Sequence, residues 1–155
     1  MGLIVTAVAA LSDTANPKRV VLVVDDDAMI AELVTEVLLE EGYAVTILAR
    51  PNTEIIHATV TKLQPDCVLL DSDVPGSFGA SWASAAWIAA QRQAVPVIMF
   101  SADAHATAEA SSHASERSQA AHFSSVLPKP FDLDELLRVV ALAVSRSPFR
   151  QGSTD

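Results

Sequence analysis

The stretch Val20-Val21-Leu22-Val23-Val24-Asp25-Asp26-Asp27 decides the fold of this chain. Its five consecutive apolar residues, four of them valine, are typical of a strand that is buried on both faces, as strands of parallel sheets are. Three aspartates end the strand, and Asp27 is placed to cap a helix. Apolar residues then recur at helical spacing before Gly42, which is placed to end that helix. The stretch therefore predicts a strand followed at once by an amphipathic helix.

The same alternation continues along the chain. Short apolar runs predict further strands at residues 44–48, 67–70, 97–100 and 123–127. Helical spacing predicts three more helices: one that ends before residue 65, one at residues 81–92 and one that begins after residue 132. Residues 101–122 are rich in Ala and Ser, so we expect one helix there with a long or irregular connection. Asp132 and Glu135 have the spacing of a capping box. Five strands alternating with five helices predict an α/β fold, a doubly wound parallel sheet with helices on both faces.

Length, charge and cysteine content limit the class of protein. The 155 residues fit one domain, which we expect at 19–145, with an amino-terminal extension at 1–18 and a tail at 146–155. A net charge of −9 has the wrong sign for neutralising nucleic-acid phosphates, so direct nucleic-acid binding is not expected. Residues 2–12 are apolar but too few to span a bilayer, so we expect no membrane anchor. A single cysteine without a disulfide or zinc motif favours the cytoplasm.

Polar residues follow the predicted strands at the points where the strands end. Because the carboxyl ends of parallel strands form the binding edge of such a sheet, these residues are expected to converge: Asp25, Asp26, Asp71, Ser101 and Lys129. Three crowded carboxylates without histidine or thiolate suit a hard divalent ion, Mg²⁺ first and Mn²⁺ second. The ion and Lys129 would neutralise the carboxylates and admit an anionic phosphoryl group. Asp71 is then a candidate nucleophile that forms an aspartyl-phosphate.

Four ordered motifs carry a resemblance to the receiver domain of two-component response regulators. They are Val-Leu-Val-Val-Asp25-Asp26-Asp27, Val-Leu-Leu-Asp71-Ser-Asp-Val-Pro75-Gly76, Ile-Met-Phe-Ser101-Ala102 and Leu-Pro-Lys129-Pro130-Phe131. The match extends from about residue 19 to residue 145. The resemblance implies a flavodoxin-like (βα)5 fold with strand order 2-1-3-4-5.

The resemblance also implies a role for each polar residue of the edge. Asp71 is the phosphoacceptor, and Ser101 and Lys129 bind the phosphoryl group. Mg²⁺ is bound by three carboxylates and one backbone carbonyl. The implied ligands are the side chains of Asp25, Asp26 and Asp71 and the backbone carbonyl of Asp73. The family further implies a cis peptide between Lys129 and Pro130.

The implied function is that of a signalling domain rather than an enzyme. It takes a phosphoryl group from a sensor histidine kinase or a histidine phosphotransfer protein onto Asp71 and switches a surface that binds a downstream protein. Residues 146–155 are too few for an output module, so we expect a stand-alone receiver. The apolar extension fits an extra packing element, a homodimer contact or a segment unrelated to the fold.

The sequence departs from the receiver pattern in three places. Val126 stands where receivers carry Tyr or Phe, which argues against the familiar aromatic switch, and Phe123 has the wrong offset to replace it. The segment between Ser101 and Lys129 is longer than usual. Asp73 and Asp103 each lie two residues beyond a site residue, and we hypothesise that their charge disfavours hydroxide near the phosphoryl group.

Two other functions are compatible with these residues. A haloacid-dehalogenase-like phosphatase also carries an Asp-x-Asp motif such as Asp71-Ser-Asp73, but there the second acidic motif follows the lysine. A receiver-like module that binds partners without phosphorylation is favoured by Val126 and by the long segment. Turnover of external substrates would indicate the phosphatase, and partner binding that Asp71→Asn leaves unaffected would favour the module.

Overall fold

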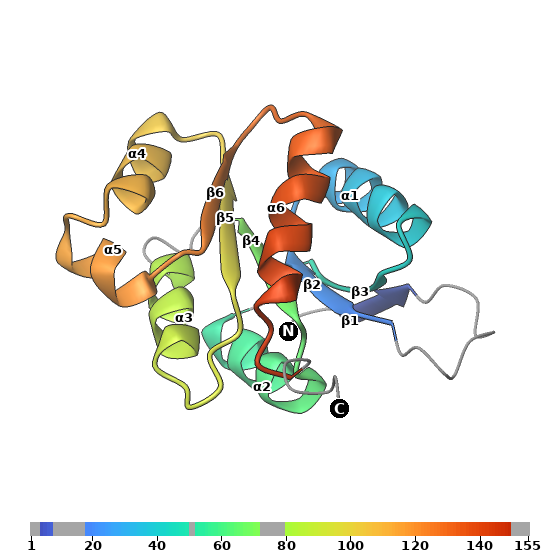
Figure 1. Cartoon of the computed structure of the whole chain (residues 1–155), viewed down its shortest axis with the longest axis horizontal. Coiled ribbons are helices and arrows are strands. Elements are labelled where there is room, and N and C mark those ends of the chain that lie inside the picture. The colour runs from blue at the N-terminus through green and yellow to red at the C-terminus, as the bar shows by residue number, and fades with distance from the viewer. Residues whose placement is uncertain (1–3, 8–17, 50–51, 72–79, 150–155) are drawn as a thin grey trace.

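The strands form one sheet, which lies at the centre of the molecule (Figure 1). The computed structural model describes residues 4–7, 18–49, 52–71 and 80–149. Across the sheet the order is β1-β3-β2-β4-β5-β6, and the strands from β2 to β6 are parallel to their neighbours. Their bounds are β1 Ile4–Ala7, β2 Val20–Val24, β3 Ala44–Leu48, β4 Cys67–Asp71, β5 Val97–Ser101 and β6 Ser125–Pro128. The five parallel strands confirm the predicted doubly wound order.

A sixth strand, β1, was not expected. It runs antiparallel along β3, with Ile4 opposite Leu48 and Ala7 opposite Val45. Without it β3 would be an edge strand with a row of unpaired backbone groups, and β-branched residues such as those of β1 pair well there. This part of the amino-terminal extension is therefore an added packing element of the sheet. Local periodicity could not show it, because the pairing joins residues far apart in sequence.

Helices cover both faces of the sheet. Their bounds are α1 Ala28–Glu40, α2 Thr53–Leu63, α3 Ala80–Ala89, α4 Ala104–Ser112, α5 Glu116–Ala121 and α6 Leu133–Ser145. Alternate strand residues enter two cores. Leu22 and Leu70 pack with α2, α3, α4 and α5, whereas Val21 and Leu69 pack with α1 and α6. Burial on both faces explains why these strands are continuous apolar runs. None of the described helices combines the length and apolar character needed to cross a bilayer.

The helix ends confirm some sequence predictions and correct others. Asp27 caps α1 by accepting from the backbone N–H groups of Met29 and Ile30, and Gly42 has the positive φ, 94°, that glycine tolerates. Asp132 stands at the N-cap of α6, but its side chain accepts no cap hydrogen bond, so the predicted capping box is absent. Helix α3 ends at Ala89 rather than at residue 92.

The single helix expected within residues 101–122 is in fact two helices, α4 and α5. His113 ends α4 in the left-handed conformation, with φ 55°. Ser115 then caps α5, because its hydroxyl oxygen accepts from the backbone N–H of Ser118. Serine competes with regular helix hydrogen bonding in this way, and this competition splits a segment whose composition alone permits one helix.

Candidate functional site

The sheet brings the predicted polar residues together at one edge. Asp25 follows β2, Asp71 ends β4, Ser101 ends β5 and Lys129 follows β6. Asp25, Asp26 and Asp71 each offer a carboxylate oxygen, and these oxygens lie within 4.8 Å of one another. The Nζ of Lys129 lies 3.2 Å from Oδ1 of Asp71 and 3.7 Å from Oδ2 of Asp25. We call this group of residues the acidic edge.

Burial gives the acidic edge unusual electrostatics. Asp25 has no exposed surface and Asp71 has almost none. Burial, followed by a hydrogen bond with Asp71, raises the pKa of Asp25 to about 7. Oδ1 of Asp25 accepts from the backbone N–H of Asp27 at 2.9 Å, whereas Oδ2 has no hydrogen-bond donor within the described ranges. A buried carboxylate oxygen without a donor, facing two further carboxylates, fits a hard divalent cation.

Several contacts hold Lys129 over the carboxylates. Its backbone N–H donates to the carbonyl of Ser101 at 2.8 Å, and its peptide bond to Pro130 is cis, as the resemblance implied. Its Nζ also lies 4.6 Å from the centre of the Phe100 ring, which Phe131 supports edge to face. The sequence gives no sign of this aromatic contact, because Phe100 lies within an apolar run that is typical of a buried strand. The lysine is therefore fixed by backbone and ring contacts as well as by charge.

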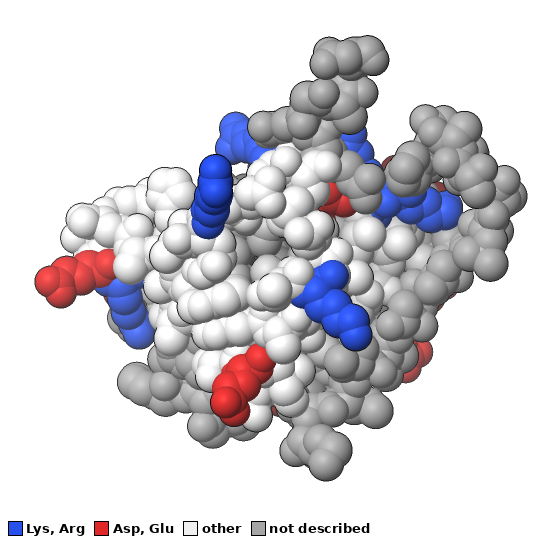
Figure 2. All heavy atoms as spheres, turned by 90° about the horizontal axis from the view of Figure 1, so that it is seen from below, with Lys and Arg blue, Asp and Glu red and all other residues white. Residues whose placement is uncertain are grey.

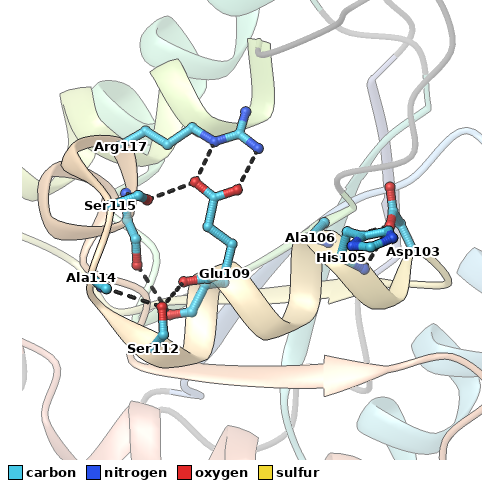
Figure 3. A network of polar contacts seen from close by, with 10 residues as sticks. Asp103, His105, Ala106, Glu109, Ser112, Ala114, Ser115 and Arg117 are labelled. Carbon is cyan, nitrogen blue, oxygen red and sulfur yellow. Dashed lines mark hydrogen bonds and ion pairs between the residues drawn. The ribbon is translucent and has the colours of Figure 1, made fainter.

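Ser101 is buried at the end of β5 and faces the start of α4. Its Oγ accepts from the backbone N–H of Asp103 at 2.9 Å, and a hydroxyl can in addition donate one hydrogen bond. Asp103 itself caps α4 by accepting from His105 and Ala106 (Figure 3). The effect of Asp103 on dephosphorylation stays a prediction. Asp73, the expected source of a backbone carbonyl ligand, lies outside the described residues.

Sequence reasoning missed Ser81, which ties α3 to the acceptor strand. Its Oγ donates to the backbone carbonyl of Asp71 at 2.8 Å, and its side chain is buried. The contact fixes the backbone that carries the Asp71 carboxylate. Serine in the first turn of a predicted helix is a general signal for a local hydrogen bond, but nothing in the spacing shows that its partner lies ten residues earlier.

The long segment between Ser101 and Lys129 is held by a polar network (Figure 3). Glu109 of α4 accepts two hydrogen bonds from Arg117 of α5, both 2.8 Å long, and one from the hydroxyl of Ser115 at 2.6 Å. The bonds from Arg117 lower the pKa of Glu109 to about 2. The Arg117 guanidinium also stacks on Trp82 of α3, 4.1 Å from the ring centre. This network joins α4 and α5 to α3.

The aromatic residues near this network lie in the core. Trp82 packs edge to face with Phe123 at 5.3 Å, and both are buried. Val126 is half-buried beside the same core cluster. Phe123 is thus a packing residue in this structure, and the expectation that it does not replace the missing aromatic residue at position 126 stays a prediction.

Comparison with known proteins agrees with this geometry. A family model described as the response regulator receiver domain matches residues 21–141. The transcriptional regulatory protein PdtaR of Mycobacterium tuberculosis is 33% identical over 135 residues, which cover 87% of this chain and 60% of PdtaR. The chain therefore spans little more than half the length of that relative.

Solved structures show the same fold. The receiver domain of NtrX from Brucella abortus is 28% identical with a TM-score of 0.67, and the match covers 82% of this chain and 99% of that one. A response regulator from Chloroflexus aurantiacus, described as putative, has a TM-score of 0.69 at 24% identity, covering 83% of this chain and 99% of that one, and supports the fold alone.

Proposed function

Because the chain belongs to the response regulator receiver family of two-component signalling, we propose that Asp71 accepts a phosphoryl group from a phosphohistidine. The observation that carries the proposal is the acidic edge itself. Three carboxylates lie within 4.8 Å of one another, and the Lys129 ammonium lies 3.2 Å from the proposed acceptor. We assign this activity to residues 19–145, with 1–18 and 146–155 as appendages, and the family match over 21–141 supports these limits.

In the proposed reaction an Oδ atom of Asp71 attacks the phosphorus atom of the phosphohistidine. A P–O bond forms as the P–N bond breaks, and the electron pair of that bond goes to the imidazole nitrogen, which takes up a proton. Lys129 donates to a phosphoryl oxygen and balances charge, and the Ser101 hydroxyl donates to another. The buried carbonyl contact from Ser81 keeps Asp71 in position while the group is transferred.

Mg²⁺ is the proposed cofactor, with Mn²⁺ as a substitute. Asp25, Asp26 and Asp71 would hold it, together with the backbone carbonyl of Asp73. The donor set is all oxygen, and the buried Oδ2 of Asp25, which accepts no hydrogen bond within the described ranges, supports the assignment. When bound, such an ion neutralises charge on the transferred phosphoryl group.

The proposed phosphoryl donor is a histidine kinase or a histidine phosphotransfer protein. The proposed location of the transfer is the cytoplasm. Helix α1, which begins directly after the acidic aspartates, carries two exposed apolar side chains one turn apart. Met29 is 81% exposed and Leu33 is 46% exposed. Exposed apolar side chains of this kind are typical of the centre of an interface, which supports a docking surface for the donor protein on α1.

The proposed output is a protein-binding surface formed by α4 and α5, not an enzymatic activity on external substrates. A phosphoryl group held by Ser101 adds charge directly before the Asp103 cap of α4. The network from Glu109 through Arg117 to Trp82 gives α4 and α5 a second connection, to α3. The phosphatase alternative is less well supported, because the acidic pair precedes the acceptor in the sequence.

Intact-protein mass spectrometry tests the proposal. With Mg²⁺ and phosphoramidate, the wild-type chain is expected to gain about 80 Da, the mass of one phosphoryl group. Asp71→Asn removes the nucleophile and is expected to gain nothing, while Asp103→Asn, which leaves the three carboxylates intact, still forms the adduct. Absence of an adduct on the wild-type chain contradicts the proposal and favours a module that binds partners without phosphorylation.

A further inference from the structure

A pocket of about 390 Å³ lies at the opposite end of the sheet from the acidic edge. Its walls come from the segment before β5, the segment before β6 and the carboxyl ends of four helices: α3, α4, α5 and α6. Figure 2 views the molecule from this end, and the described part of the surface carries scattered charges on a largely uncharged background. The size falls within the range of pockets that bind small molecules.

The ionisable side chains of this pocket are basic. His113, His122 and Arg146 line it, and no Asp or Glu belongs to its described lining. The two histidines end α4 and α5 in left-handed conformations, and their ring centres lie 6.1 Å apart. Arg146 ends α6. Three separate segments therefore bring one potential anion ligand each to the same cavity, in a chain whose net charge is −9.

These side chains lack acidic partners within the described ranges. The ion pairs found there involve Arg117, Lys129 and Arg138 instead. A basic residue at the carboxyl end of one helix is common, because it interacts favourably with the helix dipole. That explanation treats each helix separately. It does not account for three such residues around one pocket, nor for the apolar walls between them.

The walls decide what kind of anion fits. Val95, Val97, Ala121 and Phe123 are apolar and almost wholly buried, and all line the pocket. The negative ends of several helix dipoles point toward this end of the molecule, which disfavours a compact, highly charged anion such as inorganic phosphate. A ligand with one negative charge and an apolar body gains binding free energy in two ways. Its apolar body is buried against the walls, and its charged group accepts hydrogen bonds from the basic side chains.

We propose that this pocket binds a small monocarboxylate with a compact apolar body, such as one aromatic ring. The carboxylate pairs with the Arg146 guanidinium and accepts from the imidazoles of His113 and His122, which can donate an N–H in either protonation state. The apolar body lies against Val97 and Phe123. The site is separate from Asp71, so its binding does not depend on the phosphoacceptor activity.

Nuclear magnetic resonance titration of the full chain with benzoate tests the proposal. Saturable shifts are expected for the backbone amides of residues 113 and 121–124, and benzamide, which has the same shape without the charge, is expected to bind about tenfold more weakly. Arg146→Gln is expected to weaken benzoate to a similar extent. Lys62→Gln removes one positive charge from α2, which does not line the pocket, and is expected to leave benzoate binding unchanged.

The proposal would be overturned by the absence of a saturable shift with benzoate, by equal binding of benzamide, or by shifts centred on the acidic edge. Equal competition by inorganic phosphate would also contradict it, because that result indicates a general anion site. Unchanged amide spectra away from the pocket show that Arg146→Gln is folded. Asp71→Asn is expected to bind benzoate as the wild type does, which separates this test from that of the phosphoacceptor.

Discussion

The acidic edge and the segment formed by α4 and α5 are held in place by different forces. At the edge, the register of buried parallel strands sets where Asp25 and Asp71 lie, and both residues are buried. In the segment, Ala110 and Ala121 reach the core, but contacts between partly exposed side chains, Glu109 and Arg117 above all, join the two short helices to each other. A site fixed by the core keeps its geometry, while a surface fixed by polar contacts can change its arrangement at low cost. This difference suits a chemical site coupled to a variable surface.

Truncating the core beneath the edge is expected to have the largest effect on stability. Leu70→Ala removes a buried side chain next to Asp71 in β4 and is expected to lower the free energy of unfolding by about 3 kcal/mol. Chemical denaturation measures the loss. If it were under 1 kcal/mol, the strand core would not be what fixes the edge, and the contrast between the two regions would fail.

The stability of the Mg²⁺-free protein is expected to depend on pH, because the carboxylate of Asp25 is buried at the acidic edge. The pKa of Asp25 is about 7 in the folded chain, against 3.8 for the free side chain, so the folded state binds more protons between these values. Stability should therefore fall as the pH rises from 4 to 7, by on the order of 3 kcal/mol.

Asp25→Asn should abolish this fall in stability with rising pH. Near pH 7.5, saturating Mg²⁺ should return to the wild-type chain the stability that it loses without the ion. Thermal unfolding across this pH range, with and without the ion, checks both statements. A wild-type chain whose stability changes with pH as that of Asp25→Asn does would contradict the assigned electrostatics.

Breaking the contacts of Arg117 is expected to cost less. Arg117→Met keeps the aliphatic chain but loses the stacking on Trp82 and the pairing with Glu109, which for partly exposed groups amounts to about 1 kcal/mol. The phosphorylation rate of Asp71 should stay the same, while affinity for a downstream partner changes. An altered rate would show that the two regions are not separable in this way.

Effects no larger than that of Arg117→Met are expected at two helix caps. Asp103→Ala removes a cap that accepts two backbone hydrogen bonds and should cost about 1 kcal/mol. Asp132→Ala is the matched control, because Asp132 makes no cap hydrogen bond, and its effect should be near zero. Equal losses at both positions would mean that the capping contact at α4 contributes little.

The sequence predicted the edge better than it predicted the segment, for a physical reason. Residues at strand ends are recognised by the apolar runs before them, and parallel strands must bring their ends together, so Asp25, Asp71, Ser101 and Lys129 could be identified from order alone. The break between α4 and α5 depends on local hydroxyl hydrogen bonds, which composition does not reveal.

Long-range contacts were the other limit. Strand β1 pairs with β3 across some forty residues of sequence, and Ser81 reaches back to the carbonyl of Asp71. The stacking of Arg117 on Trp82 joins α5 to α3, and the hydrophobic periodicity of the two helices does not predict which of their sides face each other. The absent capping box at Asp132 shows the reverse case, in which a correct local spacing did not produce the expected hydrogen bond.

The central claim is that Asp71 becomes an aspartyl-phosphate, and chemical mapping of that residue tests it most directly. After treatment with Mg²⁺ and phosphoramidate, borohydride reduction converts an aspartyl-phosphate to homoserine, which peptide mass spectrometry locates. The account predicts homoserine at position 71, and none when Asp71 is Asn. Homoserine at Asp25, Asp26 or another carboxylate, or none anywhere in the wild-type chain, would contradict it.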